Sequence, residues 1–292
     1  MENGRNAFHG RSAFHGRSAF HGRSEFQEKT VIGPIQLYTH YISVIVRSKM
    51  QYKKSFFLYS LGMFLTSFCV FLSIYFMFQR FSQVKGFTYQ EVLLCHAIVL
   101  MGFTLAEIYA RGFDCFSGMV RSGEFDRILL RPRSALLQVL GSRFELGRVS
   151  RLLQAAVIFT YGICSSNIHW TLRKVFTVVC MLMGCCALFS GLFLIYAALS
   201  FFTLEGLEFM NIFTYGLNEH GKYPMGIYGN VILWITTFIV PFAPVQYYPL
   251  LYLLDRRQEL YLSFLPLTSF LFLVPCYMLW RFGMKHYQSS GS

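Results

Sequence analysis

The amino-acid sequence predicts an all-α, polytopic membrane protein with six transmembrane helices. Of its 292 residues, 54% are hydrophobic and only 14% are charged, whereas a soluble domain carries about 25% charged residues. Six apolar stretches each approach the roughly 20 residues that a spanning helix needs. Lysine and arginine gather in alternate connections between these stretches, as they do when those connections face the cytoplasm.

The chain begins with a polar segment, residues 1–33, in which the hexapeptide Ala-Phe-His-Gly-Arg-Ser occurs three times over residues 7–24. One histidine per repeat is a spacing that could bind a metal ion, but three short copies are too few for a stable solenoid. The composition favours a disordered basic tail that touches anionic lipid headgroups. We therefore predict no metal site here, and we see no cleavable signal peptide.

Residues 34–52 are predicted to form an amphipathic helix in the membrane interface. Ile35, Ile42 and Ile45 recur at helical spacing, and basic residues gather towards the end of the segment. Such a pattern is typical of helices that lie along a bilayer surface. The whole of 34–292 is predicted to be one transmembrane domain.

The six apolar stretches differ in how clearly they predict a span. The second is short and flanked by Glu91 and Glu107, and the fifth continues into a region with Pro241, Pro244 and Pro249. Because proline breaks helices, we expect a re-entrant element before the last span, buried in protein because lipid cannot satisfy its free backbone groups. The predicted spans are 56–78, 89–111, 146–168, 175–204, 225–243 and 262–283.

The distribution of basic residues predicts the orientation of these spans. With six spans, both termini lie on one side, and the connections on that side hold twenty lysines and arginines against six on the other. The basic side of a membrane protein faces the cytoplasm, so both termini are predicted to be cytoplasmic. This distribution also explains the net charge of +12 without a nucleic-acid partner.

The most informative connection is the loop 112–135 between the second and third spans. It is too polar to span a membrane, but Phe113, Phe116 and Val120 share one helical face, and Gly123 is a natural helix stop. Apolar residues among charged ones suit docking to a cytoplasmic protein. A solvated loop whose arginines only set the topology explains the composition equally well.

Three segments carry distinctive motifs. Residues 123–132 read GEFDRILLRP, residues 219–228 read EHGKYPMGIY and residues 241–249 read PFAPVQYYP. These motifs resemble the permease subunits of type-2 ABC exporters, in the six-span branch that usually combines two permeases with one kind of ATPase. The resemblance covers roughly 34–292, and Lys222 departs from it, because arginine is usual there.

The resemblance implies a cytoplasmic coupling helix in the loop 112–135, which inserts into a groove on an ATPase and transmits its closure to the spans. The implied partners are two ATPase copies, a second permease and the lipid bilayer of a bacterial inner membrane. The second permease is expected to be a diverged paralogue, or else a copy of this chain. The implied ATPase-coupling residues are Phe113, Phe116, Val120, Arg121, Glu124, Asp126, Arg127 and Arg131.

We predict that the chain itself is not an enzyme. Residues 216–222 match the Gly-x-x-x-x-Gly-Lys pattern of a phosphate-binding loop, but Tyr223 replaces the required serine or threonine and Pro224 follows. We therefore expect no cofactor on this chain and assign ATP and magnesium to the partner ATPase. The eight cysteines lack the spacing of a zinc site.

Ionisable and aromatic residues in or beside the spans are candidates for a pathway or gate. Glu107 lies one helical turn before Arg111 and is expected to pair with it, and His96 faces either a pathway or a hydrogen-bond partner in the bundle. The tyrosines fit an outer gate or an interfacial aromatic belt equally well. The pathway or gate candidates are His96, Glu107, Glu219, Tyr223, Pro241, Tyr247 and Tyr248.

These observations favour the transmembrane subunit of an ATP-driven exporter that works by alternating access. A membrane-embedded enzyme is disfavoured, because the spans hold no cluster of carboxylates, histidines or nucleophiles. The alternative that the sequence leaves open is a sensor or immunity subunit of an ABC complex that binds a substrate without moving it.

Overall fold

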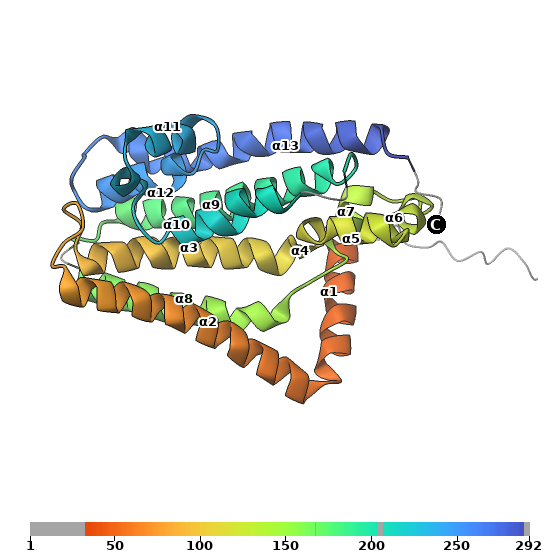
Figure 1. Cartoon of the computed structure of the whole chain (residues 1–292), viewed down its shortest axis with the longest axis horizontal. Coiled ribbons are helices and arrows are strands. Elements are labelled where there is room, and N and C mark those ends of the chain that lie inside the picture. Colours follow the sequence, from red (N-terminus) through yellow and green to blue (C-terminus); the bar gives the residue numbers. More distant parts are fainter. Residues whose placement is uncertain (1–32, 167, 204–206, 289–292) are drawn as a thin grey trace, which may run out of the picture.

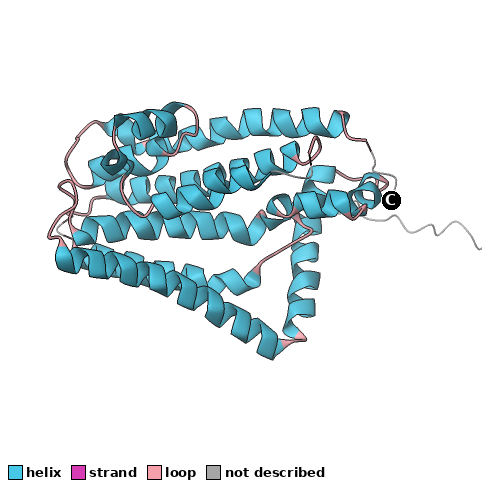
Figure 2. Ribbon diagram, viewed as in Figure 1, coloured by secondary structure: helices cyan, strands magenta, loops and turns pink. Residues whose placement is uncertain are grey.

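The computed structural model describes residues 33–166, 168–203 and 207–288, and this part of the chain is helical apart from turns, loops and one isolated β-bridge (Figure 2). The predicted all-α class is confirmed for it. The hexapeptide repeats of the predicted disordered tail lie outside the described residues.

The first two helices meet at a sharp corner. Helix α1 (Pro34–Met50) stands almost perpendicular to the long helices, and α2 (Lys53–Arg80) runs along the bundle (Figure 1). The bounds of α1 agree with the helix predicted at 34–52. Its orientation across the end of the bundle is the one that an interfacial helix would have.

Helix α3 (Tyr89–Tyr109) forms the centre of the bundle. The Thr88 amide donates a hydrogen bond of 2.8 Å to the Glu91 carboxylate, which satisfies one of the free N–H groups at the helix start. In Figure 1, α2 and α8 (Val149–Ser165) lie on one side of α3, and α9 (Leu172–Leu199) and α13 (Thr268–Lys285) lie on the other. Most of α3 is therefore buried although its sequence looked the least like a span.

Small residues allow these helices to approach closely. A Cβ added at Gly102 of α3 would come within 2.3 Å of the Cys185 Cβ, and one at Gly184 would come within 2.5 Å of the Pro266 carbonyl oxygen. Both glycines lie where two backbones meet. Close approach of this kind is how helices in a membrane gain packing energy, since burial from lipid adds no hydrophobic driving force.

Four short helices connect α3 to α8 at the end of the bundle that also carries the described C-terminal residues (Figure 1). A single 3₁₀ turn, η1 (Leu146–Arg148), leads into α8. The four helices are α4 (Arg111–Asp114), α5 (Phe116–Arg121), α6 (Glu124–Leu129) and α7 (Ala135–Leu140).

The segment between α9 and α13 is broken into short pieces. From α9 the chain returns along the bundle to α10 and then reaches α11 and α12 at the end opposite to α4–α7 (Figure 1). The pieces are η2 (Leu207–Phe209), the π-helical turn η3 (Ile212–Gly216), α10 (Leu217–His220), η4 (Met225–Tyr228), α11 (Asn230–Phe238), α12 (Ala243–Leu253), η5 (Leu260–Ser263) and η6 (Leu265–Leu267).

The predicted span at 225–243 is wrong as a continuous helix. Gly229 has a φ of +99° and interrupts it, and the nine residues of α11 rise only about 14 Å, less than half of the roughly 30 Å hydrocarbon core. Helices α11 and α12 are bent by 113° to one another. Hydropathy predicted a continuous span because it averages over apolar residues and does not register these backbone breaks.

The predicted count of twenty lysines and arginines on the cytoplasmic side included Lys222, and the structure places this residue elsewhere. The carbonyl of the neighbouring Gly221 accepts a hydrogen bond of 3.1 Å from Gln246 in α12 and contacts Cys95 in α3. Lys222 therefore lies inside the length of the bundle, near the half of α3 that is remote from α4–α7. The excess of basic residues on the other connections remains large without it.

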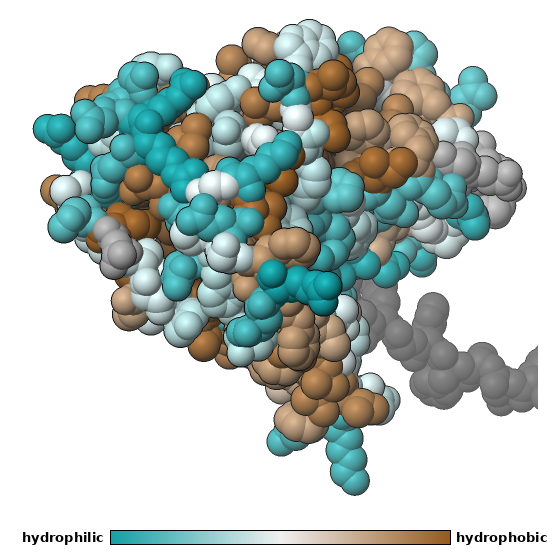
Figure 3. All heavy atoms as spheres, turned by 60° about the vertical axis from the view of Figure 1, so that its left-hand side comes forward, coloured by the Kyte–Doolittle hydropathy of each residue, from teal (hydrophilic) through white to brown (hydrophobic). Residues whose placement is uncertain are grey.

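Within the described residues, four helices are long and apolar enough to cross a membrane, or five if α11 and α12 together count as one span. Helix α8 matches the predicted third span but has 17 residues. Hydrophilic side chains gather over the end of the bundle with α11, and hydrophobic ones predominate along the flanks (Figure 3). The chain is a multi-pass membrane protein.

Candidate functional site

The loop α4–α7 folds back under the end of the bundle because an aromatic cluster anchors it. The Phe116 ring centroid lies 4.9 Å from Phe125 and 5.0 Å from both Trp280 and Phe201. These side chains come from α5, α6, α13 and the end of α9. Edge-to-face contacts of this kind add to the energy of burial, so the loop is a packed element rather than a solvated connection.

The structure divides the predicted coupling residues into two groups. Phe113, Phe116 and Val120 are at most 4% exposed and belong to the hydrophobic core. Their prediction as direct docking contacts therefore needs correction, because they face the bundle and hold the loop in place. The apolar helical face was recognised from its spacing, but spacing alone does not tell an anchor from a docking surface.

The charged residues of the loop lie at its surface. Arg121, Arg127 and Arg131 are exposed, and Glu124 and Asp126 are partly exposed. Gly123, with a φ of +67°, joins α5 to α6 in the left-handed region, which an L side chain rarely adopts. This turn places the first residues of α6 beside the end of α5.

A hollow of about 430 Å³ separates this charged face from α1. Glu124, Arg127 and Arg131 line one wall, and His40 and Val44 of α1 line another. Leu130, which is 85% exposed, lies next to Arg131 in the chain. Exposed apolar and charged side chains around a concavity are features of a protein-docking surface.

The C-terminal residues close the other side of the loop. Tyr287 donates a hydrogen bond of 3.0 Å to the Asp126 carboxylate, and its ring lies 5.2 Å from Phe125. Burial and the Asp126 carboxylate raise the pKa of the Tyr287 hydroxyl to about 12. The hydroxyl consequently remains a donor at neutral pH and ties α6 to the end of α13.

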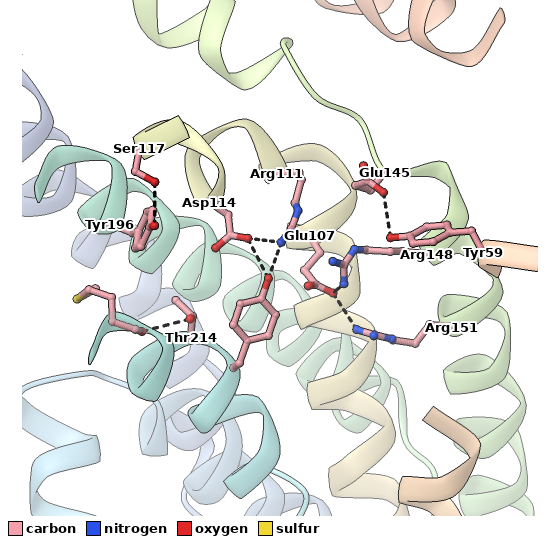
Figure 4. Close-up of polar contacts among 12 residues, drawn as sticks. Tyr59, Glu107, Arg111, Asp114, Ser117, Glu145, Arg148, Arg151, Tyr196 and Thr214 are labelled. Atoms are coloured by element: carbon pink, nitrogen blue, oxygen red, sulfur yellow. Dashed lines mark hydrogen bonds and ion pairs between the residues drawn. The ribbon is translucent and has the colours of Figure 1, made fainter. Parts of the chain in front are cut away.

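A buried ion-pair network connects α3 to the start of α8 directly beside the loop (Figure 4). Glu107 is fully buried, and its carboxylate pairs with Arg148 and, at 2.9 Å, with Arg151. A buried charge needs partners of opposite sign to avoid a large desolvation cost. The network thus fixes α8 against α3 at the point where both meet the loop.

The prediction that Glu107 pairs with Arg111 is wrong. Arg111 instead pairs with Asp114, one turn further along the chain, and donates to the Tyr215 hydroxyl. Tyr215 in turn donates a hydrogen bond of 2.9 Å to Asp114. The helix axis changes between α3 and α4, and this turn directs Arg111 to η3, as Figure 4 shows.

A second set of contacts joins α1 and α2 to the same region. Glu145, just before η1, pairs with Lys49 of α1 at 3.1 Å and accepts a hydrogen bond of 3.2 Å from Tyr59 of α2. Polar contacts from α1, α2, α3 and α8 therefore gather in the region beside the loop.

The comparison with known proteins places the chain in a family. A family model described as an ABC-2 family transporter protein matches residues 64–291. The chain belongs to the ABC-2 transporter family. No curated protein and no solved structure matches it.

Membership of the ABC-2 family makes this chain a transmembrane subunit of an ABC transporter. ABC-2 permeases are in general non-catalytic and associate with an ABC ATPase. The loop α4–α7 and its ion-pair network thus belong to a protein that works with a nucleotide-hydrolysing partner.

Apart from Glu107, the pathway and gate candidates of this ABC-2 chain lie away from the loop, and three of them lie in or next to α12. Tyr247 and Tyr248 of α12 lie with their ring centroids 5.4 Å apart, and the Tyr247 ring packs so closely on Gly226 that a Cβ there would lie 2.3 Å away. Pro241 lies in the break between α11 and α12. This set forms a packed outer element around α12.

The remaining candidates lie around α10. Tyr223 contacts the Met77 sulfur of α2 at 3.4 Å. Glu219 pairs with Lys222, and His96 of α3 is buried, with no hydrogen-bond partner for its Nε2 within the described residues. The structure therefore brings Glu219 and His96 to one region, where they line a hollow with Arg151, an ion-pair partner of Glu107.

Gln246 is an important residue that the sequence did not single out. It is fully buried in α12, its side-chain amide donates to the carbonyls of Gly221 and Tyr223, and its oxygen accepts from the Met225 amide at 3.2 Å. These bonds satisfy the irregular backbone before α11. The sequence signal that could have identified Gln246 is its position as a polar residue among three prolines in an apolar run.

Proposed function

We propose that this chain forms, with a second permease, the translocation pathway of an ATP-driven exporter, and that the surface of α5 and α6 receives the ATPase. The observation that carries the proposal is the packed loop between α3 and α8, which presents Glu124, Arg127 and Arg131 beside a hollow. Its aromatic anchor makes it stiff enough to transmit a force.

Motion of the ATPase would reach the membrane through buried contacts. A push on α5 or α6 acts on Trp280 of α13 through Phe116 and Phe125, and α3 and α8 are linked by Glu107 beside the loop. Packed elements of this kind tend to move as rigid bodies between discrete arrangements. Alternating access then follows as a rigid reorientation of the two permeases.

We further propose six crossings with both termini in the cytoplasm. Five of them are α2, α3, α8, α9 and α13. The remaining one is the broken segment 207–220, after which α11 and α12 form a re-entrant element on the outer side. The excess of lysine and arginine at the end with α4–α7 supports this orientation. Irregular backbone at membrane depth is tolerated where it is buried in protein or lines a cavity, and Tyr215 and Asn218 of this segment line a hollow in the bundle.

Under this proposal, ATP and magnesium bind two ATPase subunits and this chain holds no cofactor. The second permease is proposed to be a diverged paralogue, and the membrane a bacterial inner membrane. Under the same proposal, this chain itself needs neither nucleic acid nor a bound metal ion.

The docking surface is tested with the double variant Glu124→Ala/Arg127→Ala. The matched control is Arg257→Ala/Glu259→Ala, which removes the same two charge types from exposed positions at the opposite end of the chain's bundle. In membranes that contain the whole complex, the first variant should lower the ATPase that co-purifies with the permease by roughly tenfold, equivalent to about 1.4 kcal/mol. The control should leave it unchanged.

Equal ATPase recovery with the two double variants would refute the docking surface. Export itself is tested by ATP-dependent uptake of candidate amphiphiles into inverted vesicles that carry the complex. A complex that binds both ATPase and ligand but accumulates no ligand would favour the sensor or immunity subunit.

A further inference from the structure

A small polar hollow of about 100 Å³ lies between the helices of the bundle. Four elements contribute to it, namely α2, α3, α8 and the broken segment around α10. Its apolar walls include Val70 and Phe103. The polar side chains that line it include Ser67, His96, Arg151, Tyr215, Glu219 and Lys222, together with Thr66 and Asn218.

The charges around this hollow do not balance. Lys222 pairs with Glu219, but the lysine side chain is 14% exposed and the glutamate side chain 53%, so the cation faces inwards more than its partner does. Arg151 shares the single carboxylate of Glu107 with Arg148. Three cations therefore face two carboxylates, and the region carries one excess positive charge.

Two polar atoms at the hollow have unused hydrogen-bonding capacity. Within the described residues, neither Nε2 of His96 nor Nε of Arg151 has a hydrogen-bond partner, and His96 is only 3% exposed. A buried polar atom without a partner has lost its hydrogen bonds to water and gained nothing in return, which destabilises the protein. Most buried polar groups in proteins are satisfied, so an imidazole left open beside a net positive charge points to a ligand.

We propose that this hollow binds the anionic headgroup, a carboxylate or a phosphate, of an amphipathic molecule. Its volume corresponds to about three water molecules at roughly 30 Å³ each, which suits a headgroup and excludes a whole amphiphile. The apolar part of the ligand would lie against α2 and α8, where Phe64, Phe68 and Phe71 border an apolar groove of about 790 Å³. As a substrate class, this inference rests on the proposed function.

Binding is measured by scintillation proximity, with radiolabelled dodecyl phosphate and the full chain in a neutral maltoside detergent. Unlabelled dodecanoate should compete with the probe, whereas dodecyltrimethylammonium, which has the same chain and the opposite charge, should not. Inorganic phosphate should compete only weakly. Equal competition by the cationic amphiphile would overturn the anion site, and full competition by inorganic phosphate would overturn the amphiphile and leave a free anion.

Substitutions locate the site. Lys222→Gln should weaken dodecyl phosphate binding about tenfold or more, since hydrogen bonds to charged groups contribute about 1.5–3 kcal/mol, and Lys222→Arg should restore most of it. Arg257→Gln removes one exposed positive charge near the bundle end and should bind like the unaltered chain. Unchanged binding by Lys222→Gln would refute the assignment.

His96→Leu covers the case in which Lys222→Gln fails to fold. Replacing an unpartnered buried imidazole with an apolar side chain should keep or raise thermal stability, yet it should weaken dodecyl phosphate binding severalfold. A purely structural role for His96 predicts no loss of binding. Because these assays need neither ATP nor the ATPase, their outcome is independent of whether the complex exports or only senses its ligand.

Discussion

Glu107 shows how a single residue can hold the transporter together at the junction of the spans and the loop. Its carboxylate is fully buried and is shared by Arg148 and Arg151. Removing one partner of a buried ion pair leaves uncompensated charge, which is more costly than removing the whole pair. Replacement of Glu107 should therefore be much more harmful than replacement of an exposed glutamate.

Glu107→Gln is expected to destabilise the protein by roughly 3–5 kcal/mol, because two guanidinium groups lose their shared anion. The measurement is thermal or SDS-induced unfolding in detergent, followed by tryptophan fluorescence. Glu259→Gln, at an exposed position, is the matched control and should have little effect. Similar unfolding curves for the two variants would show that the network is not structural.

At the scale of elements, the position of the loop α4–α7 depends on close backbone approach. A Cβ added at Gly112 would lie 1.9 Å from the carbonyl oxygen of Val139 in α7, whereas nothing lies within 4 Å of one added at Gly118 in α5. Both glycines are in short helices with ordinary backbone angles. The same substitution should thus have opposite effects at the two positions.

Gly118→Ala should stabilise the protein by up to about 1 kcal/mol through helix propensity, and Gly112→Ala should destabilise it by roughly 1–3 kcal/mol through overpacking. The shift of α4 against α7 should also lower ATPase recovery in the complex for Gly112→Ala. Melting temperatures and co-purification of the ATPase test both parts. If both alanine variants changed the melting temperature in the same direction, the close contact between Gly112 and Val139 would be contradicted.

For the whole molecule, the decisive question is which segment crosses the membrane before α11. If 207–220 crosses and α11–α12 is re-entrant, then Asn230 and Arg257 lie on the same side. If α11 and α12 together make one span, these residues lie on opposite sides. Both residues are exposed, so each can carry a label.

We expect Asn230→Cys and Arg257→Cys to react with a membrane-impermeant maleimide from the outer side, and Ser134→Cys, at the loop, only from the cytoplasmic side. The measurement compares the extent of labelling in intact cells with that in inverted vesicles. The unaltered chain gives the background from its eight native cysteines. Labelling of Asn230→Cys and Arg257→Cys from opposite sides would exclude the re-entrant arrangement.

The sequence by itself determined the helical class, the approximate positions of most long helices and the presence of short helices in the loop after α3. These depend on local properties, namely runs of apolar residues, the spacing of Phe113 and Phe116, and the turn at Gly123. The motif around Glu124 and Arg127 also predicted the family that the family model then confirmed.

Only the tertiary structure decided which partners the buried polar groups have, and that 225–243 is not one continuous helix. Glu107 pairs with Arg148 and Arg151 rather than with its neighbour in the helix, because α8 brings two guanidinium groups to it. Likewise, hydropathy favoured 225–243 as a continuous span, since it does not register the backbone break at Gly229. In the bundle, Lys222 pairs with Glu219 and lines a hollow between distant segments, and no local pattern encodes that contact.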